Sequence, residues 1–192
     1  MVFDACVLYH SNRGLCIQSR DAGDIENILF SNMTIETELQ PSKWWGAGEP
    51  IHISDLQRHP DTKLGHVRQI RFSNILCKGE SGIYLRGCAA QPLEDIGFDN
   101  VRVEVEKTSD VPGGFYDDRP IGAASSGGQF AGIYTNAIAG IFAREVNGLT
   151  LRNVQVVWDA PKNGIYGEAL DQDKIQNLIL NHDSFGSSPS AK

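Results

Sequence analysis

The sequence predicts an all-β fold, a parallel β-helix, from two observations: a repeated strand pattern and the near absence of helical periodicity. The repeat is an eight-residue pattern in which apolar residues alternate with polar ones until an asparagine interrupts them. Its four clear copies begin at Ile28, Ile70, Ile96 and Leu149. Each copy predicts a strand, a bend at the asparagine and a second short strand, because alternation is the signature of a strand.

The spacing of the asparagine position predicts how these strands stack. With weaker copies near both ends, this position falls at residues 5, 32, 74, 100, 153 and 182, which are 27, 42, 26, 53 and 29 residues apart. Periods near 26 to 29 residues, with two insertions, are typical of solenoids. We expect about six turns in a single domain over residues 1–185, followed by a disordered tail at 186–192. The stacked asparagines should be buried and bond one another.

A second short strand accompanies each copy, and its alternation predicts which side chains face outward. Residues such as Ile51 and Ile53 should face the core, so their neighbours should point away from it. The outward set is Cys16, Gln18, His52, Ser54, Tyr84, Arg86, Phe142 and Arg144. Sugar-binding surfaces combine polar groups with aromatic faces. The predicted substrate-binding residues are therefore Gln18, Trp44, Trp45, His52, Tyr84 and Arg86. The alternative is that these side chains merely cover a solvent-facing surface.

Glu49, beside the two tryptophans, is the candidate catalytic residue. Burial against indole rings would raise the pKa of its carboxyl toward the range of a general acid. No spacing of His and Cys predicts a metal site, and no cofactor is predicted. Cys6 and Cys77 occupy core positions of the repeat, where a thiol packs as a small hydrophobe.

Composition restricts the classes of partner. The chain has 192 residues, of which 41% are hydrophobic, and a net charge of -7. This acidic balance argues against nucleic acid and against an anionic membrane, because no basic stripe faces phosphates. No signal peptide or membrane-spanning segment is visible. The first predicted strand, from Phe3 to Leu8, has no cap before it. We expect a second copy, a missing N-terminal β-helix half or another partner to cover this edge.

Three segments resemble the C-terminal half of glycoside hydrolase family 28, the polygalacturonase-like enzymes. They are RGLCIQSR at 13–20, GDIENILFSN at 23–32 and WWGAGEPI at 44–51, and the segments at 112–120 and 166–170 are similar as well. The resemblance implies a right-handed parallel β-helix that is the C-terminal part of a longer one. It also implies a secreted protein and inverting hydrolysis of a polysaccharide or oligosaccharide.

The chain departs from this family at the residues that carry the chemistry. The family's three aspartates and its Gly-His-Gly histidine have no counterparts, and its Arg-Ile-Lys motif is replaced by Cys16-Ile17-Gln18. A galacturonate carboxylate would therefore lack two charge-assisted partners, and hydrolysis of polygalacturonate by this chain is not expected. Two functions stay open: a carbohydrate-active β-helix related to these glycosidases, and a non-catalytic β-helix that binds a glycan or a protein through its outward groove.

Overall fold

The computed structural model describes residues 1–41, 45–119, 132–159 and 166–187. Within these ranges the chain is all β, with no helix. The strands are β1 (Val2–Asp4), β2 (Val7–Ser11), β3 (Leu15–Ser19), β4 (Ile25–Thr37), β5 (Ile51–Asp55), β6 (Val67–Gly79), β7 (Ile83–Arg86), β8 (Leu93–Val105), β9 (Phe115–Asp117), β10 (Ile133–Thr135), β11 (Ile141–Trp158), β12 (Leu170–Asn181) and β13 (Ser184–Phe185). Most of the predicted tail, residues 188–192, lies outside the described residues.

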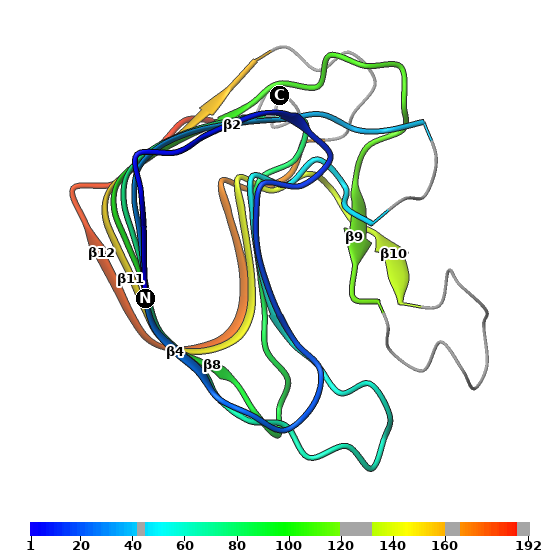
Figure 1. The fold of residues 1–192 in the computed structure, drawn as a ribbon. Helices are drawn as coiled ribbons and strands as arrows, with labels where there is room; N and C mark the ends of the chain where they lie inside the picture. Colours follow the sequence, from blue (N-terminus) through cyan, green and yellow to red (C-terminus); the bar gives the residue numbers. More distant parts are fainter. Residues whose placement is uncertain (42–44, 120–131, 160–165, 188–192) are drawn as a thin grey trace.

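One large parallel sheet curls into a solenoid-like coil. Its main path runs β1-β4-β6-β8-β11-β7-β5-β3, and β2, β12 and β13 pair with strands of this path. Parallel neighbours need long connections, so strands adjacent in space are distant in sequence. Figure 1 shows them stacked one behind another around a common interior. The predicted all-β, parallel, solenoid-like fold is confirmed.

The coil turns corners at residues with positive φ. β4, β6 and β8 each have 13 residues, and each turns at its third and eighth residue. All six predicted bend positions, residues 5, 32, 74, 100, 153 and 182, have φ between 52° and 58°. Asparagine tolerates this left-handed region better than most residues that carry a side chain. The predicted strand–bend–strand unit is therefore confirmed.

The asparagines form the predicted ladder, but on the surface of the coil. Nδ2 of Asn74 donates to Oδ1 of Asn32 at 3.1 Å, and Nδ2 of Asn100 donates to Oδ1 of Asn74 at 2.8 Å. Asn153 adds the next bond, to Asn100, at 2.9 Å. All four side chains are exposed, so the predicted burial is wrong. The apolar residues on both sides of each bend fill the interior, and the amides satisfy one another at its edge.

Columns of apolar side chains fill the interior. Ile51 and Ile53 are fully buried, as alternation predicts. The rings of Phe30, Phe72 and Phe98 stack with centroids 5.2 and 4.7 Å apart, an arrangement that adds to the energy of burial. Cys77 lies in this core as predicted. Cys6 is exposed, so its predicted core position is wrong. It lies between β1 and β2, the terminal strands of the coil.

A two-stranded antiparallel sheet covers part of the outer face of the coil. β9 and β10 pair Tyr116 with Tyr134 and project beside the coil (Figure 1). Their tyrosines pack against Tyr84 and Phe142, which face away from the interior. Outward-facing residues of the large sheet are therefore buried where this hairpin lies.

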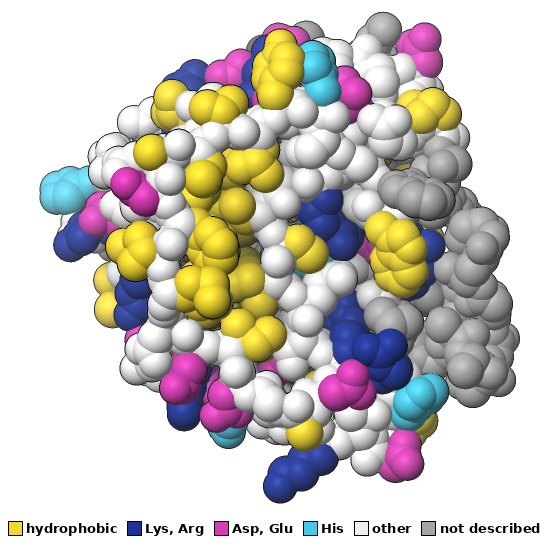
Figure 2. Space-filling model, viewed as in Figure 1, with side chains coloured by type: hydrophobic (Ala, Val, Ile, Leu, Met, Phe, Trp, Pro, Cys, Tyr) yellow, Lys and Arg dark blue, Asp and Glu magenta, His cyan; other side chains and the backbone are white. Residues whose placement is uncertain are grey.

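One end of the coil leaves its core uncovered. Among the described strands, β1 and β2 pair only with β4. Large apolar side chains are exposed there: Met1, Val2, Phe3, Val7 and Tyr9. Figure 2 shows hydrophobic side chains filling the space between the two walls of the coil at this end. Coverage of this edge by a partner stays a prediction.

Candidate functional site

The predicted site residues converge on the outer face of β3, β5 and β7. Parallel register places His52 between Cys16 and Tyr84, and Ser54 between Gln18 and Arg86. The same columns continue onto β11 with Phe142 and Arg144. Strands separated by more than 30 residues thus present their outward side chains at one surface.

His52 lies at the centre of a buried hydrogen-bond network. Its Nδ1 is 2.9 Å from Oε1 of Glu49, and its Nε2 is 3.0 Å from Oγ of Ser54. Gln18 Nε2 lies 3.3 Å from the same ring nitrogen. Burial lowers the pKa of His52 to about 4, so the ring is neutral near pH 7. It then donates from Nδ1 to the carboxylate and accepts at Nε2.

The contacts of Glu49, His52 and Ser54 match the order of acid, base and nucleophile in hydrolytic triads. Ser54, however, has no exposed surface, and Nη2 of Arg20 donates to its hydroxyl at 3.1 Å. A buried oxygen that already accepts from Arg20 is not available to a substrate carbonyl. We therefore interpret the three residues as a network that satisfies buried polar groups.

Glu49 is buried, and its contacts among the described residues are with charged groups, the His52 ring and a backbone amide. Arg13 donates to its Oε1 from Nε at 2.8 Å, and Nη2 of Arg13 lies 2.6 Å from the same oxygen. The backbone N–H of Ala47 donates to Oε2. Burial alone would raise the pKa of Glu49, but Arg13 and His52 outweigh it and lower the pKa to about 2. The expected rise toward a general acid is therefore wrong.

Trp45 lies at the rim of this face, and Trp44 lies outside the described residues. The Trp45 ring is half exposed, and the Arg119 guanidinium sits 4.4 Å from its centroid. Arg119 also holds Asp117 through two bonds of 2.8 Å. Stacking on a guanidinium fixes the exposed indole in one orientation, which suits it to pack against a flat ligand.

Asp118 joins the hairpin to the large sheet, a role that the sequence analysis did not identify. Tyr84 donates its hydroxyl hydrogen to Oδ1 of Asp118, and the Tyr134 hydroxyl lies 3.0 Å from that of Tyr84. Arg86 Nε lies 3.5 Å from Oδ2 of Asp118. Burial raises the pKa of Asp118. The signal in the sequence is the run at 115–119, where two aromatic residues are followed by three charged ones between a Gly and a Pro.

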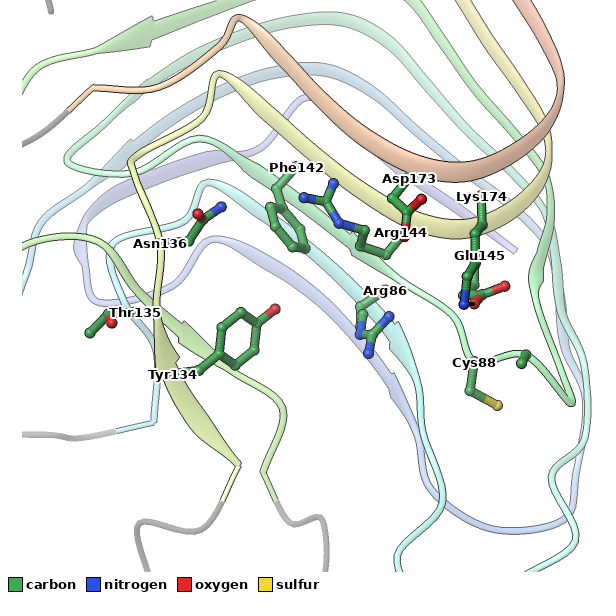
Figure 3. Close-up of a pocket in the computed structure, with 11 residues that line it drawn as sticks. Arg86, Cys88, Tyr134, Thr135, Asn136, Phe142, Arg144, Glu145, Asp173 and Lys174 are labelled. Carbon is green, nitrogen blue, oxygen red and sulfur yellow. Dashed lines mark hydrogen bonds and ion pairs between the residues drawn. The ribbon is translucent and has the colours of Figure 1, made fainter.

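A pocket of about 560 Å³ opens beside the hairpin. Its lining comes from β7, β10, β11 and β12 and includes Arg86, Cys88, Ala89, Tyr134, Thr135, Asn136, Phe142, Arg144, Glu145, Asp173 and Lys174. In Figure 3, Tyr134 reaches in from β10 with its hydroxyl toward Arg86. Arg144 lies against the ring of Phe142, 4.0 Å from its centroid. The pocket thus combines aromatic faces with several hydrogen-bond donors.

The charges that line this pocket are nearly balanced. Arg144 Nη2 pairs with Oδ1 of Asp171 at 2.5 Å, and Lys174 pairs with Glu145 at 2.7 Å. Arg86 has Asp118 as its partner. Asp173 has no ion pair within the described parts of the chain. The positive side chains of the pocket are therefore matched by negative ones. Such a lining suits the hydroxyls of a neutral ligand better than the carboxylates of an acidic polysaccharide.

Within the described ranges, no group of three or more His, Cys, Asp or Glu side chains could hold a metal ion. No helix long and apolar enough to cross a membrane occurs in the same ranges. Comparisons with protein-family models, with curated proteins and with solved structures found no match to this chain. Function is therefore argued from the site itself.

Proposed function

We propose that this chain binds a neutral oligosaccharide in the pocket beside β10. In this proposal the chain forms about six turns of a right-handed parallel β-helix and is the C-terminal part of a longer, secreted β-helix related to family 28 glycoside hydrolases. The observation that carries the proposal is the lining of the pocket: two aromatic rings beside amide, guanidinium and hydroxyl groups. Sugars present hydroxyls at their edges and C–H groups on their faces, and this combination serves both.

The predicted residues divide into three groups under this proposal. Arg86 lines the pocket and contacts the ligand directly. Tyr84 and His52 support the surface from below, because both are buried. Trp45 and Gln18 lie farther along the same outer face and would contact a longer chain of sugar units. The residues that contact the ligand in this proposal thus include Tyr134, Asn136 and Arg144, which line the pocket and were not in the predicted set.

Calorimetric titration with a panel of oligosaccharides tests the binding. We expect neutral pentose or hexose oligomers to bind and oligogalacturonates to bind at least tenfold more weakly. Arg144→Gln should reduce the affinity for the neutral ligand about tenfold, since it removes charge-assisted hydrogen bonds. Arg152→Gln is the matched control, because Arg152 is exposed and pairs with Asp99 away from the pocket. Absence of binding to every sugar, or equal loss in both variants, would contradict the proposal.

Hydrolysis of polygalacturonate is not part of this function. Glu49 is ionised down to a pH of about 2, so it has no proton to give at neutral pH. An assay of reducing ends after incubation with polygalacturonate should give the same value with and without the protein. Release of reducing ends that a single carboxylate substitution abolishes would refute this expectation. Restoring cations with Cys16→Arg and Gln18→Lys should leave the assay at background, because orientation alone does not activate water.

A further inference from the structure

Two arginines are neighbours in the pocket beside β10, and each is paired with a carboxylate from another element. Arg86 on β7 and Arg144 on β11 are partners in the parallel register, and both line the pocket (Figure 3). Asp118, next to β9, lies beside Arg86 with its Oδ2 3.5 Å from Nε. Arg144 is paired with Asp171 on β12, whose Oδ1 is 2.5 Å from Nη2. Without these carboxylates, the two guanidinium groups would form an anion-binding pair.

Asp171 is not among the described residues that line the pocket, but it fixes two residues that do. Besides the ion pair, its backbone carbonyl accepts a hydrogen bond from Nη1 of Arg144 at 2.7 Å. Its Oδ2 accepts from Nδ2 of Asn136 at 2.9 Å. The side chains of Arg144 and Asp171 are only 19% and 25% exposed, so solvent screens this pair less than a pair on the open surface. One carboxylate therefore both neutralises Arg144 and orients Asn136.

We propose that Asp171 is the specificity-determining residue that makes this pocket select neutral over acidic sugars. The inference rests on the proposed function, because it concerns the same pocket. Asp171 cancels the charge of Arg144, whose guanidinium lies 4.0 Å from the centroid of the Phe142 ring. A uronate carboxylate would have to displace Asp171 to pair with Arg144, and Asp171 would then lose its charged partner. A sugar hydroxyl needs only one N–H group, and a guanidinium has five.

Calorimetric titration of Asp171→Asn tests the proposal with two probes: the neutral oligomer that wild type binds best, and trigalacturonate. Asparagine keeps the size of the side chain and an acceptor for Arg144, and Asn136 can rotate its amide to accept from the new NH₂ group. The uncompensated charge of Arg144 should raise the affinity for trigalacturonate about tenfold. The affinity for the neutral oligomer should change less than about threefold, and added salt should reduce the gain.

Matched variants identify the source of the gain. Asp171→Glu keeps the charge and should keep the wild-type preference. Arg144→Gln, added to Asp171→Asn, removes the uncompensated cation and should abolish the gain. Asp99→Asn removes the same charge from the pair with Arg152, away from the pocket, and should leave both affinities unchanged. Circular dichroism confirms that each variant is folded. If Asp171→Asn does not fold, Asp171→Ser, which is also neutral, replaces it with the same expected gain.

The possible failures of this inference and of the proposed function are distinct. A folded Asp171→Asn that binds the neutral oligomer but binds trigalacturonate no better than wild type overturns the role of Asp171 and leaves the proposed function intact. Loss of both ligands in the folded variant would assign Asp171 a structural role. A gain as large in Asp99→Asn would assign the effect to net charge. Absence of sugar binding by the wild-type protein contradicts the proposed function itself.

Discussion

The two faces of the same strands are buried in opposite ways. On the inner face of β5, Ile51 and Ile53 pack among aliphatic and aromatic columns. On the outer face of the same strand, His52 and Ser54 are equally buried, but within hydrogen bonds and ion pairs beneath neighbouring segments. Strand alternation determines to which face of the sheet a side chain points, but it does not determine whether that face is exposed to solvent. The inner face is stabilised by packing, which does not depend on pH. The outer face is stabilised by ion pairs and hydrogen bonds of charged groups, whose contribution changes with pH.

The largest expected loss of stability comes from a substitution on the inner face. Phe72→Ala should destabilise the protein by roughly 3–5 kcal/mol, because Phe72 is almost fully buried between two stacked rings. Urea unfolding measures the change. Leu76→Ala, at an exposed position of the same strand, is the control and should cost less than about 0.5 kcal/mol. A cost below about 1 kcal/mol for Phe72→Ala would mean that the columns contribute little.

The next largest loss of stability comes from a substitution on the outer face. Glu49→Gln should cost about 3 kcal/mol at pH 7, because it leaves the buried Arg13 guanidinium without its nearest carboxylate. The folded pKa of about 2 lies below the ordinary value of 4.5, so this stabilisation is present above pH 4.5 and is lost as the pH falls toward 2. Unfolding curves of wild type and variant should therefore converge in acid. A difference that is constant from pH 7 to pH 3 would assign the loss to packing.

The contribution of Asp55 to stability should change with pH in the opposite direction. It is fully buried, and burial raises its pKa to about 6, although Ser19 and Arg20 oppose this rise. Between pH 3.8 and 6 the folded protein holds a proton that the unfolded chain releases, so this group weakens the fold as the pH rises. Asp55→Asn should be more stable than wild type by about 2 kcal/mol at pH 7 and equal to it near pH 3. Equal stability of variant and wild type at both pH values would show that the fold does not disfavour the ionised form of Asp55.

The smallest effect concerns the corners that join the two faces. Asn74→Ala should cost about 1 kcal/mol, since it removes ladder bonds and places an alanine at a φ of 55°. Asn74→Gly loses the same bonds but accepts this φ freely, so it separates the two contributions. Thermal unfolding of the two variants compares them. If glycine costs as much as alanine, the amide ladder and not the corner geometry sets the requirement.

The sequence predicts the inner face well and the outer face poorly, for a physical reason. The positions of Ile51, Phe72 and Asn74 follow from local alternation and from a bend that recurs at fixed spacing, so the coil and its core can be predicted from the repeat. The environment of Glu49 depends on Arg13, which lies 36 residues away and arrives through the pairing of β3 with β5. The burial of Tyr84 depends on the β9–β10 hairpin, which lies outside the repeat. Neither contact can be predicted from the residues adjacent in sequence to Glu49 or Tyr84.

The number of residues between the two bends of a turn is fixed, so each position within that stretch has a fixed inward or outward orientation. In β4, β6 and β8 the two positive-φ residues are always five positions apart, as at Asn27 and Asn32. Removing one residue between them would move every later side chain of that turn to the opposite face. Outside this stretch, the spacing between equivalent bends ranges from 26 to 53 residues while the register of the pairing is kept. Evolution can therefore lengthen this protein by whole loops between turns, but not by single residues within them.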